Sequence, residues 1–255
     1  MPGNSVAVRG SAVCAAALAM TNPAAASAFD IALTFSGSPT TSQEAAFTDA
    51  EAFWESQVTG YQPGVADRTL VIDASIKGID GDGETLGQAG PTYGVDDEGF
   101  TLPTKGTMEF DSADVGSLES TGTFGDVVRH EMAHVMGFGT LWTDNSVYTN
   151  GTGQYIGNAG LAAYKAEFHP SAAFVPVELD HGPGTKDAHW DEGWAGGNTA
   201  LMTGFLNTPT FVSRTTVESF ADLGYTVAPV PLPAGAWLML GALGTLGLVG
   251  RRLAA

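Results

Sequence analysis

The pattern of apolar and polar positions predicts a body that mixes strands with helices. From Phe29 to Phe35, apolar residues alternate with small or polar ones, as in a strand that buries one face. Two further apolar stretches, Thr69–Ile76 and the shorter Gly106–Phe110, also predict strands. Between the first two strands, from about residue 42 to residue 58, apolar residues recur at helical spacing. The fold class is therefore α/β or α+β, and we expect α+β with a mixed α/β first part.

Capping residues predict where two helices begin and end. Thr41 and Glu44 form a capping-box pattern at the start of the first helix. Thr123 is a candidate N-cap of a later helix, with Asp126 three residues on. Gly137 stands where that helix would end with a left-handed residue.

The pattern changes after Gly139, which predicts two parts within the body. From there on glycine-rich segments prevail, and helical spacing is found only near Ala159–Phe168 and Thr215–Leu223. We therefore expect an N-terminal subdomain over residues 29–139 and a more irregular C-terminal subdomain over residues 140–228.

The first 28 residues have the composition of a signal peptide. Arg9 is followed by an apolar run from Val13 to Met20 and then by Ala26-Ser27-Ala28, a small-residue pattern that signal peptidase accepts. We expect residues 1–28 to be removed during export, with a mature start near Phe29.

Cys14, the chain's single cysteine, lies inside that segment. A lipid attachment site would need leucine three residues earlier, where Ser11 stands, which disfavours lipidation. The expected mature chain has no thiol and forms no disulfide, so its stability must come from core burial and from metal binding.

The C-terminal segment, residues 229–255, has the features of a sorting signal. The sequence VPLPA at 230–234 precedes an uncharged apolar run from Ala234 to Gly250, which would span about 26 Å as a helix, and Arg251-Arg252 follows. This order resembles the PEP-CTERM signals that exosortases recognise in Gram-negative bacteria. The resemblance implies a transient inner-membrane anchor that is cleaved, after which the mature protein is handed to the cell surface or released; the alternative is a buried core helix.

Charge limits the possible partners. The chain carries 28 acidic and 10 basic residues, a net charge of −18. Residues 29–228 keep all 28 acidic but only seven basic side chains, which leaves a net charge of −21. Nucleic acid and anionic membrane surfaces are therefore poor partners.

Two histidines stand one helical turn apart on the helix that is predicted to end near Gly137. His130 and His134 share one helix face and can direct a nitrogen to the same ion. Zinc suits histidine nitrogen together with water. Glu131 lies beside such an ion rather than toward it, and can take a proton from a water molecule. The pattern predicts a catalytic zinc site; the alternative is two histidines buried by chance in a core.

Catalytic zinc usually has three protein ligands, so a third must exist. The short motif HExxHxxGxxH would place it at residue 140, which is Thr140. His169, His181 and His189 remain, and spacing alone does not choose among them.

Several motifs in order resemble the leishmanolysin family of metzincin metallopeptidases in a compact bacterial form. They are HEMAHVMGFGTLW, GTKDAHWDE, ALMTG and SFADLGYTV, preceded by LGQAGP and GTMEFDSAD. The match touches most of residues 29–227. It implies a metzincin fold, with His189 as the third zinc ligand and Met202 as the Met-turn residue, an apolar floor under the histidines. Animal and protozoan relatives are rich in disulfides and can block zinc with a propeptide cysteine, which the expected mature chain lacks.

Other polar clusters are weaker signals. The segment Asp80–Gly87 is similar to a calcium loop, but Thr85 and Pro91 stand where glycine and glutamate would be needed, so a solvated turn is the main interpretation. Asp96-Asp97-Glu98 is interpreted as a loop of solvated charge. The chain has no GxSxG motif and no phosphate-binding glycine pattern, so serine hydrolase and nucleotide enzyme functions have no support.

The expected function is that of an exported zinc endopeptidase with Glu131 as general base and a polypeptide substrate. The substrate would lie extended between the subdomains and pair with an edge strand such as Gly106–Phe110. The alternative from another class is a surface adhesin or matrix protein that keeps a structural metal, for which the glutamate between the histidines would be unnecessary.

Overall fold

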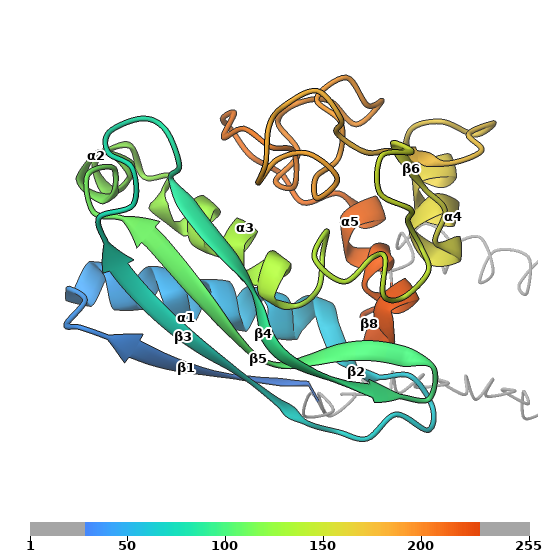
Figure 1. Ribbon diagram of the computed structural model, residues 1–255, viewed down its shortest axis with the longest axis horizontal. Coiled ribbons are helices and arrows are strands. Elements are labelled where there is room, and N and C mark those ends of the chain that lie inside the picture. The colour runs from blue at the N-terminus through green and yellow to red at the C-terminus, as the bar shows by residue number, and fades with distance from the viewer. Residues whose placement is uncertain (1–28, 230–255) are drawn as a thin grey trace, which may run out of the picture.

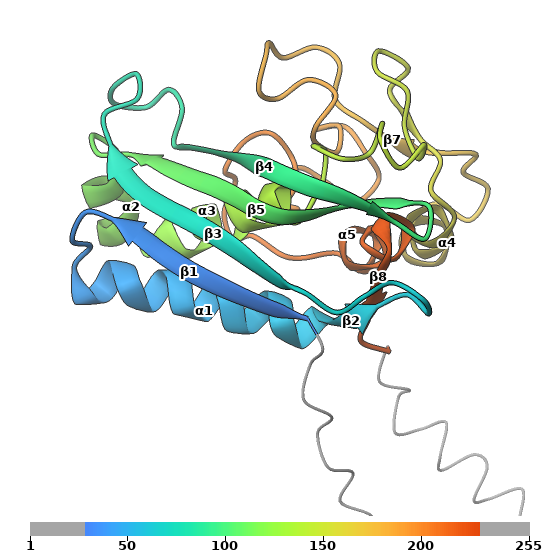
Figure 2. The same cartoon turned by 60° about the horizontal axis from the view of Figure 1, so that its bottom comes forward.

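A four-stranded sheet is the largest element of the fold. The computed structural model describes residues 29–229. Strands β1 (Asp30–Ser36), β3 (Thr69–Lys77), β5 (Phe100–Asp111) and β4 (Gly87–Asp97) lie in the order β1-β3-β5-β4 (Figures 1 and 2). The first three are parallel, whereas β4 runs antiparallel to β5. One edge of the sheet is therefore β4, and the other is β1.

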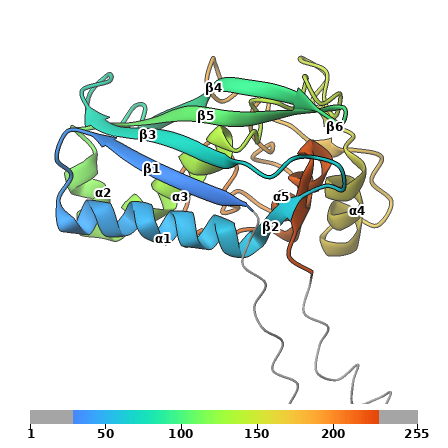
Figure 3. The same ribbon diagram turned by 90° about the horizontal axis from the view of Figure 1, so that it is seen from below.

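Helices α1 (Thr41–Gln57) and α3 (Phe124–Val135) pack against one face of the sheet, as Figure 3 shows. The rings of Phe47 on α1, Phe110 on β5 and Phe124 on α3 meet edge to face, with centroids 5.3, 5.9 and 5.5 Å apart in the three pairs. Such pairs add to the stabilisation that burial of the rings already provides. The short helix α2 (Val115–Thr121) connects β5 to α3. This apolar layer fixes α3 on the sheet.

A glycine on β5 allows α3 to approach the sheet closely. A methyl group at Gly106 would lie 2.3 Å from Cγ1 of Val135 and 2.8 Å from the carbonyl oxygen of Gly90. No side chain fits between the two layers at this point. The end of α3 therefore lies directly on the strands.

The second half of the described chain has only short regular elements. Its last strand, β8 (Tyr225–Val227), connects it to the first half by pairing with β2 (Val58–Tyr61). β8 pairs antiparallel with β2, and Tyr225 of β8 stacks on Tyr61 of β2 with ring centroids 5.4 Å apart. The core is continuous between the two halves. The elements not yet located are β6 (Gln154–Tyr155), α4 (Asn158–Glu167), β7 (Val175–Pro176), α5 (Arg214–Ser219) and a 3-10 turn (Ala221–Leu223).

The mixed α/β class predicted from the sequence is confirmed, with several corrections to the elements. The capping box of α1 is formed by Thr40 and Gln43, one residue earlier than Thr41 and Glu44. Thr123 precedes α3 but its side chain makes no cap hydrogen bond. Gly137 does adopt the left-handed conformation, with φ of 111°.

The prediction of Gly106–Phe110 as an edge strand is wrong. These residues belong to the longer strand β5, which pairs with β3 on one side and β4 on the other. The edge is β4, which the sequence did not predict as a strand. None of its residues is buried, so its sequence shows no alternation of apolar positions, and its register shifts on both sides of Tyr93.

The acidic run at residues 96–98 is not simply solvated charge. Asp97 ends β4 and forms an ion pair with Arg68, and its carboxylate also accepts a hydrogen bond from the backbone N–H of Ala66. Glu98 and Gly99 form the turn to β5, both with positive φ. The run therefore helps to fix the hairpin that joins β4 to β5 within the sheet.

The loop that leads from β3 to β4 is held mainly by the buried carboxylate of Asp111. Oδ2 of Asp111 accepts hydrogen bonds from the backbone N–H groups of Ile79, Asp80 and Gly81 at 3.1, 2.8 and 2.8 Å, and Oδ1 accepts from Ala113 at 2.9 Å. These bonds, first among them that from Ala113, lower the pKa of Asp111 to about 2. The negative charge thus organises the approach to β4.

The substitution Asp111→Asn is expected to lower the unfolding temperature by several degrees at neutral pH, because an amide nitrogen cannot accept from these N–H groups. Asp82→Asn, an exposed change in the same loop, should leave it unchanged. The folded-state pKa of Asp111 is depressed below 3.8. The contribution of its carboxylate to the free energy of unfolding is therefore fully present above that value and is lost as pH falls toward 2. Calorimetry should show that the difference in unfolding temperature between wild type and Asp111→Asn becomes smaller as pH falls over this range. A constant difference would contradict the stabilising role of the Asp111 carboxylate.

Within residues 29–229, no helix has the length and apolar character needed to cross a membrane. The expected signal peptide at 1–28 and the apolar run at 234–250 lie outside the described residues. Both therefore stay predictions.

Candidate metal centre

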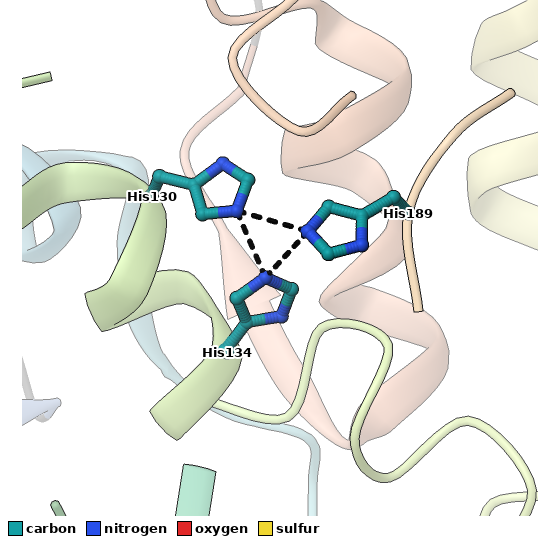
Figure 4. A group of neighbouring side chains, drawn as sticks. All are labelled: His130, His134 and His189. Carbon is teal, nitrogen blue, oxygen red and sulfur yellow. Dashed lines mark hydrogen bonds between the residues drawn. The ribbon is translucent and has the colours of Figure 1, made fainter. Parts of the chain in front are cut away.

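Three histidine side chains from distant parts of the chain converge beside α3. His130 and His134 project from α3, and His189 comes from the loop region between β7 and α5 (Figure 4). Their Nε2 atoms are 3.0 Å apart in each of the three pairs, which the dashed lines of Figure 4 mark. Within residues 29–229, this is the one group of three or more histidine, cysteine or acidic side chains close enough to share an ion.

Each ring is oriented by a backbone carbonyl on its far side. The pairs are His130 Nδ1 with Leu201 O at 2.6 Å, His134 Nδ1 with Phe138 O at 2.9 Å, and His189 Nδ1 with Thr185 O at 2.9 Å. A carbonyl oxygen only accepts, so each Nδ1 carries the hydrogen and the Nε2 of a neutral ring has none. Three Nε2 lone pairs therefore face one another, and none can donate to the others. This is the arrangement of ligands around a cation.

Burial keeps the three rings uncharged. It lowers the pKa of His130 to about 4 and, together with the neighbouring His130, that of His189 to about 3. The pKa of His134 falls well below its usual value through burial and through the two neighbouring histidines. All three imidazoles are therefore neutral at physiological pH, which is the form that binds a metal.

The spacing of the nitrogens fits a small divalent ion. Imidazole nitrogens bound to one zinc ion at about 2.0–2.1 Å in tetrahedral directions stand roughly 3.3 Å apart. The observed 3.0 Å is close to that value. The group can therefore bind a metal ion; three imidazoles suit zinc, copper, iron or nickel.

The segment that carries His189 is anchored by the residue that follows it. Trp190 is fully buried, stacks on Trp142 and meets Phe138 edge to face, with ring centroids 5.0 Å apart in both pairs. Its indole N–H donates to Oγ1 of Thr216 at 2.9 Å. Since Phe138 and Trp142 follow α3 directly, this aromatic cluster ties the third histidine to the helix that carries the other two.

A glycine contact completes this connection. Gly139 has a φ of +72°, and a Cβ there would lie 2.2 Å from the carbonyl oxygen of Ala188. Both the backbone conformation and the close approach require glycine. The chain that leaves α3 therefore packs directly against Ala188, the residue before His189.

The segment of Leu201 and Met202 closes the site from another side. The Leu201 carbonyl orients His130, and the Met202 carbonyl accepts the backbone N–H of Trp190 at 2.9 Å. Met202 itself is fully buried. The segment named by the resemblance is thus hydrogen-bonded both to a histidine of α3 and to the neighbour of His189.

The two other candidate histidines lie elsewhere. His169 is exposed and stacks on Tyr164, with ring centroids 6.3 Å apart. His181 is also exposed, and its Nδ1 lies 3.2 Å from Oε2 of the buried Glu178. Neither belongs to the converging group. Of the three histidines that the sequence left open, the structure brings His189 to the pair.

Glu131 follows His130 on α3 and is not part of the group of potential ligands. Its side chain is 6 % exposed, and burial raises its pKa to about 8. No hydrogen bond or ion pair from the described residues reaches its carboxyl group. A cation held by the histidines would favour the carboxylate form, because an opposite charge nearby lowers the pKa.

The segment Asp80–Gly87 does not assemble a calcium site of carboxylates. The Asp80 carboxylate accepts hydrogen bonds from the backbone and the hydroxyl group of Thr85. Of the side chains in the described range, only the three histidines are grouped as possible ligands. Calcium binding stays a prediction without support from this geometry.

Comparison of the chain with models of protein families returns no match, and neither does comparison with curated proteins. The function is therefore inferred from the site itself and from the motifs of the sequence.

Replacing His189 by alanine should weaken metal binding by orders of magnitude, because one of three ligands is lost. Since metal binding is coupled to folding, it should also lower the unfolding temperature of the metal-loaded protein. His169→Ala and His181→Ala serve as controls, because both side chains are exposed and neither belongs to the group. Metal retained after dialysis against a mild chelator distinguishes the variants. Loss of metal from His181→Ala, with retention by His189→Ala, would contradict the geometry.

Proposed function

We propose that this chain is a zinc-dependent endopeptidase of the metzincin type, related to leishmanolysin. Its main support is that three neutral imidazole nitrogens converge, while the helix that carries two of them also carries Glu131, a buried carboxyl group with no hydrogen-bond partner among residues 29–229. A histidine trio and an adjacent glutamate are the parts that metal-assisted hydrolysis of a peptide bond requires.

The composition of the site favours catalysis over a structural metal. Structural zinc sites have four protein ligands and are closed. Here the group contains three histidines, and no fourth histidine, cysteine or acidic side chain from residues 29–229 joins it. A coordination position is thus left for water or substrate. A surface adhesin with a structural metal would need neither this position nor Glu131.

His130, His134 and His189 would hold the zinc ion through Nε2. Zinc bound there would polarise the scissile carbonyl, acidify a water molecule and stabilise negative charge on the carbonyl oxygen. Glu131 takes the proton of the attacking water and passes it to the leaving amine. The three backbone carbonyls behind the rings keep the imidazoles in one tautomer throughout.

The substrate is a polypeptide that lies extended along β4. This edge strand has unpaired backbone groups on its outer side, which can form a ladder with an added strand. β4 packs against α3, and Gly87 at its start lies against the side chain of Glu131. A peptide paired with β4 would therefore pass beside the general base.

The variant Glu131→Ala should keep its zinc and its fold but lose peptide cleavage by orders of magnitude, because Glu131 acts as a base and not as a ligand. Zinc content, the circular dichroism spectrum and cleavage of a denatured protein substrate measure the three properties on the full chain and on residues 29–229. Cleavage by this variant at the wild-type rate would rule out the proposed mechanism.

The proposal includes export and sorting to the cell surface. Its support is the sequence of residues 1–28 and 229–255, and the partners it implies are signal peptidase and an exosortase-type enzyme. The membrane would be contacted only through the C-terminal segment before it is processed.

Mass spectrometry of protein recovered from the surface or medium of the producing cell should find a chain that starts near Phe29 and ends near residue 230. Recovery of chains that still contain Arg251 and Arg252 would instead indicate a permanent anchor.

A further inference from the structure

We infer that Gly87 is a positioning residue for Glu131: the missing side chain at this point of β4 leaves the space that sets where the carboxyl group lies. The inference rests on the proposed function, and it assigns a task to a residue outside the histidine trio. A Cβ atom at Gly87 would lie 3.0 Å from Cγ, 3.1 Å from Oε1 and 3.2 Å from Cδ of Glu131. All three contacts are tighter than ordinary van der Waals distances.

Backbone conformation does not explain the glycine. Gly87 pairs with Phe110 in the β4–β5 ladder and is not among the residues with positive φ. Any residue can adopt an extended conformation, and a glycine inside a strand costs stability. Space for a neighbouring group is the remaining physical reason, and that neighbour is Glu131 alone among the nearest atoms.

Packing is also the only restraint on the Glu131 carboxyl group that the described residues provide. No hydrogen bond or ion pair from them reaches it. Most buried carboxyl groups are oriented by hydrogen bonds, as Asp111 is by four backbone N–H groups. At Glu131 the wall formed by the Gly87 backbone takes that role.

Other glycines on the sheet have different neighbours. Gly106 faces Val135 of α3, while a Cβ at Gly90 would meet only Cγ2 of Thr140, at an ordinary 3.7 Å. Gly90 therefore offers a matched comparison: it lies on the same strand, without positive φ and without contact to Glu131.

The first test measures the contact without metal or activity. In metal-free protein, Gly87→Ala should lower the unfolding temperature by several degrees. In a Glu131→Ala background it should not, because the three crowded atoms are then absent. Gly90→Ala should show the same effect in both backgrounds. If Gly87→Ala fails to fold, recovery of a folded protein in the Gly87→Ala/Glu131→Ala double variant is the equivalent result. Equal effects of Gly87→Ala in both backgrounds would overturn the inference.

The second test measures catalysis by the zinc-loaded full chain. Gly87→Ala should lower kcat about 10-fold or more, because displacement of a catalytic group by a fraction of an ångström is costly, while KM and zinc content change little. In the Glu131→Ala background it should not lower the residual rate further. Gly125→Ala, on α3 with nothing within 4 Å of its Cβ, should keep wild-type kinetics.

The outcomes separate the two claims. If wild type cleaves peptides and Gly87→Ala has the same kcat, the positioning role is wrong and the proposed function stands. If zinc-loaded wild type cleaves no peptide, the proposed function fails. A dependence of the Gly87→Ala effect on Glu131 in the metal-free protein would then show a packing contact without a catalytic role.

Discussion

Three imidazole nitrogens face one another at 3.0 Å, and the packing of the second half of the chain against α3 holds them there. Their hydrogens are on the far side of each ring, bound to backbone carbonyls, so the near sides present lone pairs alone. A folded chain without a cation has to hold these lone pairs together against their repulsion. A cation bound between them would therefore stabilise the fold, and the protein around the site has to supply rigidity from several directions.

That rigidity comes from close contacts between segments that are far apart in the chain. Gly106 brings α3 onto the sheet, and Gly139 brings the exit of α3 against Ala188. The indole of Trp190, stacked on Trp142, then holds the segment of the third histidine in the core. If residues 1–28 are removed as proposed, the chain has no cysteine for a disulfide, and these packing contacts would be its main internal links.

The predictable part of the site is local in sequence. His130, Glu131 and His134 could be identified because the helical period places residues four apart on one face. Spacing left the third histidine open, and the motif resemblance favoured His189. The orienting carbonyls could not be predicted, since every residue has one and only the folded backbone selects them. The strand β4 was missed because an edge strand needs no alternation of apolar residues. The contact between Gly87 and Glu131 could not be predicted either, because it exists only where β4 packs against α3.

We propose that His130, His134 and His189 together bind one metal ion, and that this ion is zinc. X-ray absorption at the zinc edge, on protein with its metal content determined, can establish both points. We expect one zinc per chain, with three imidazole nitrogens at about 2.0–2.1 Å and one oxygen ligand. A chain that binds no metal in the presence of excess zinc, or a zinc ion coordinated by fewer than three imidazoles, would contradict it.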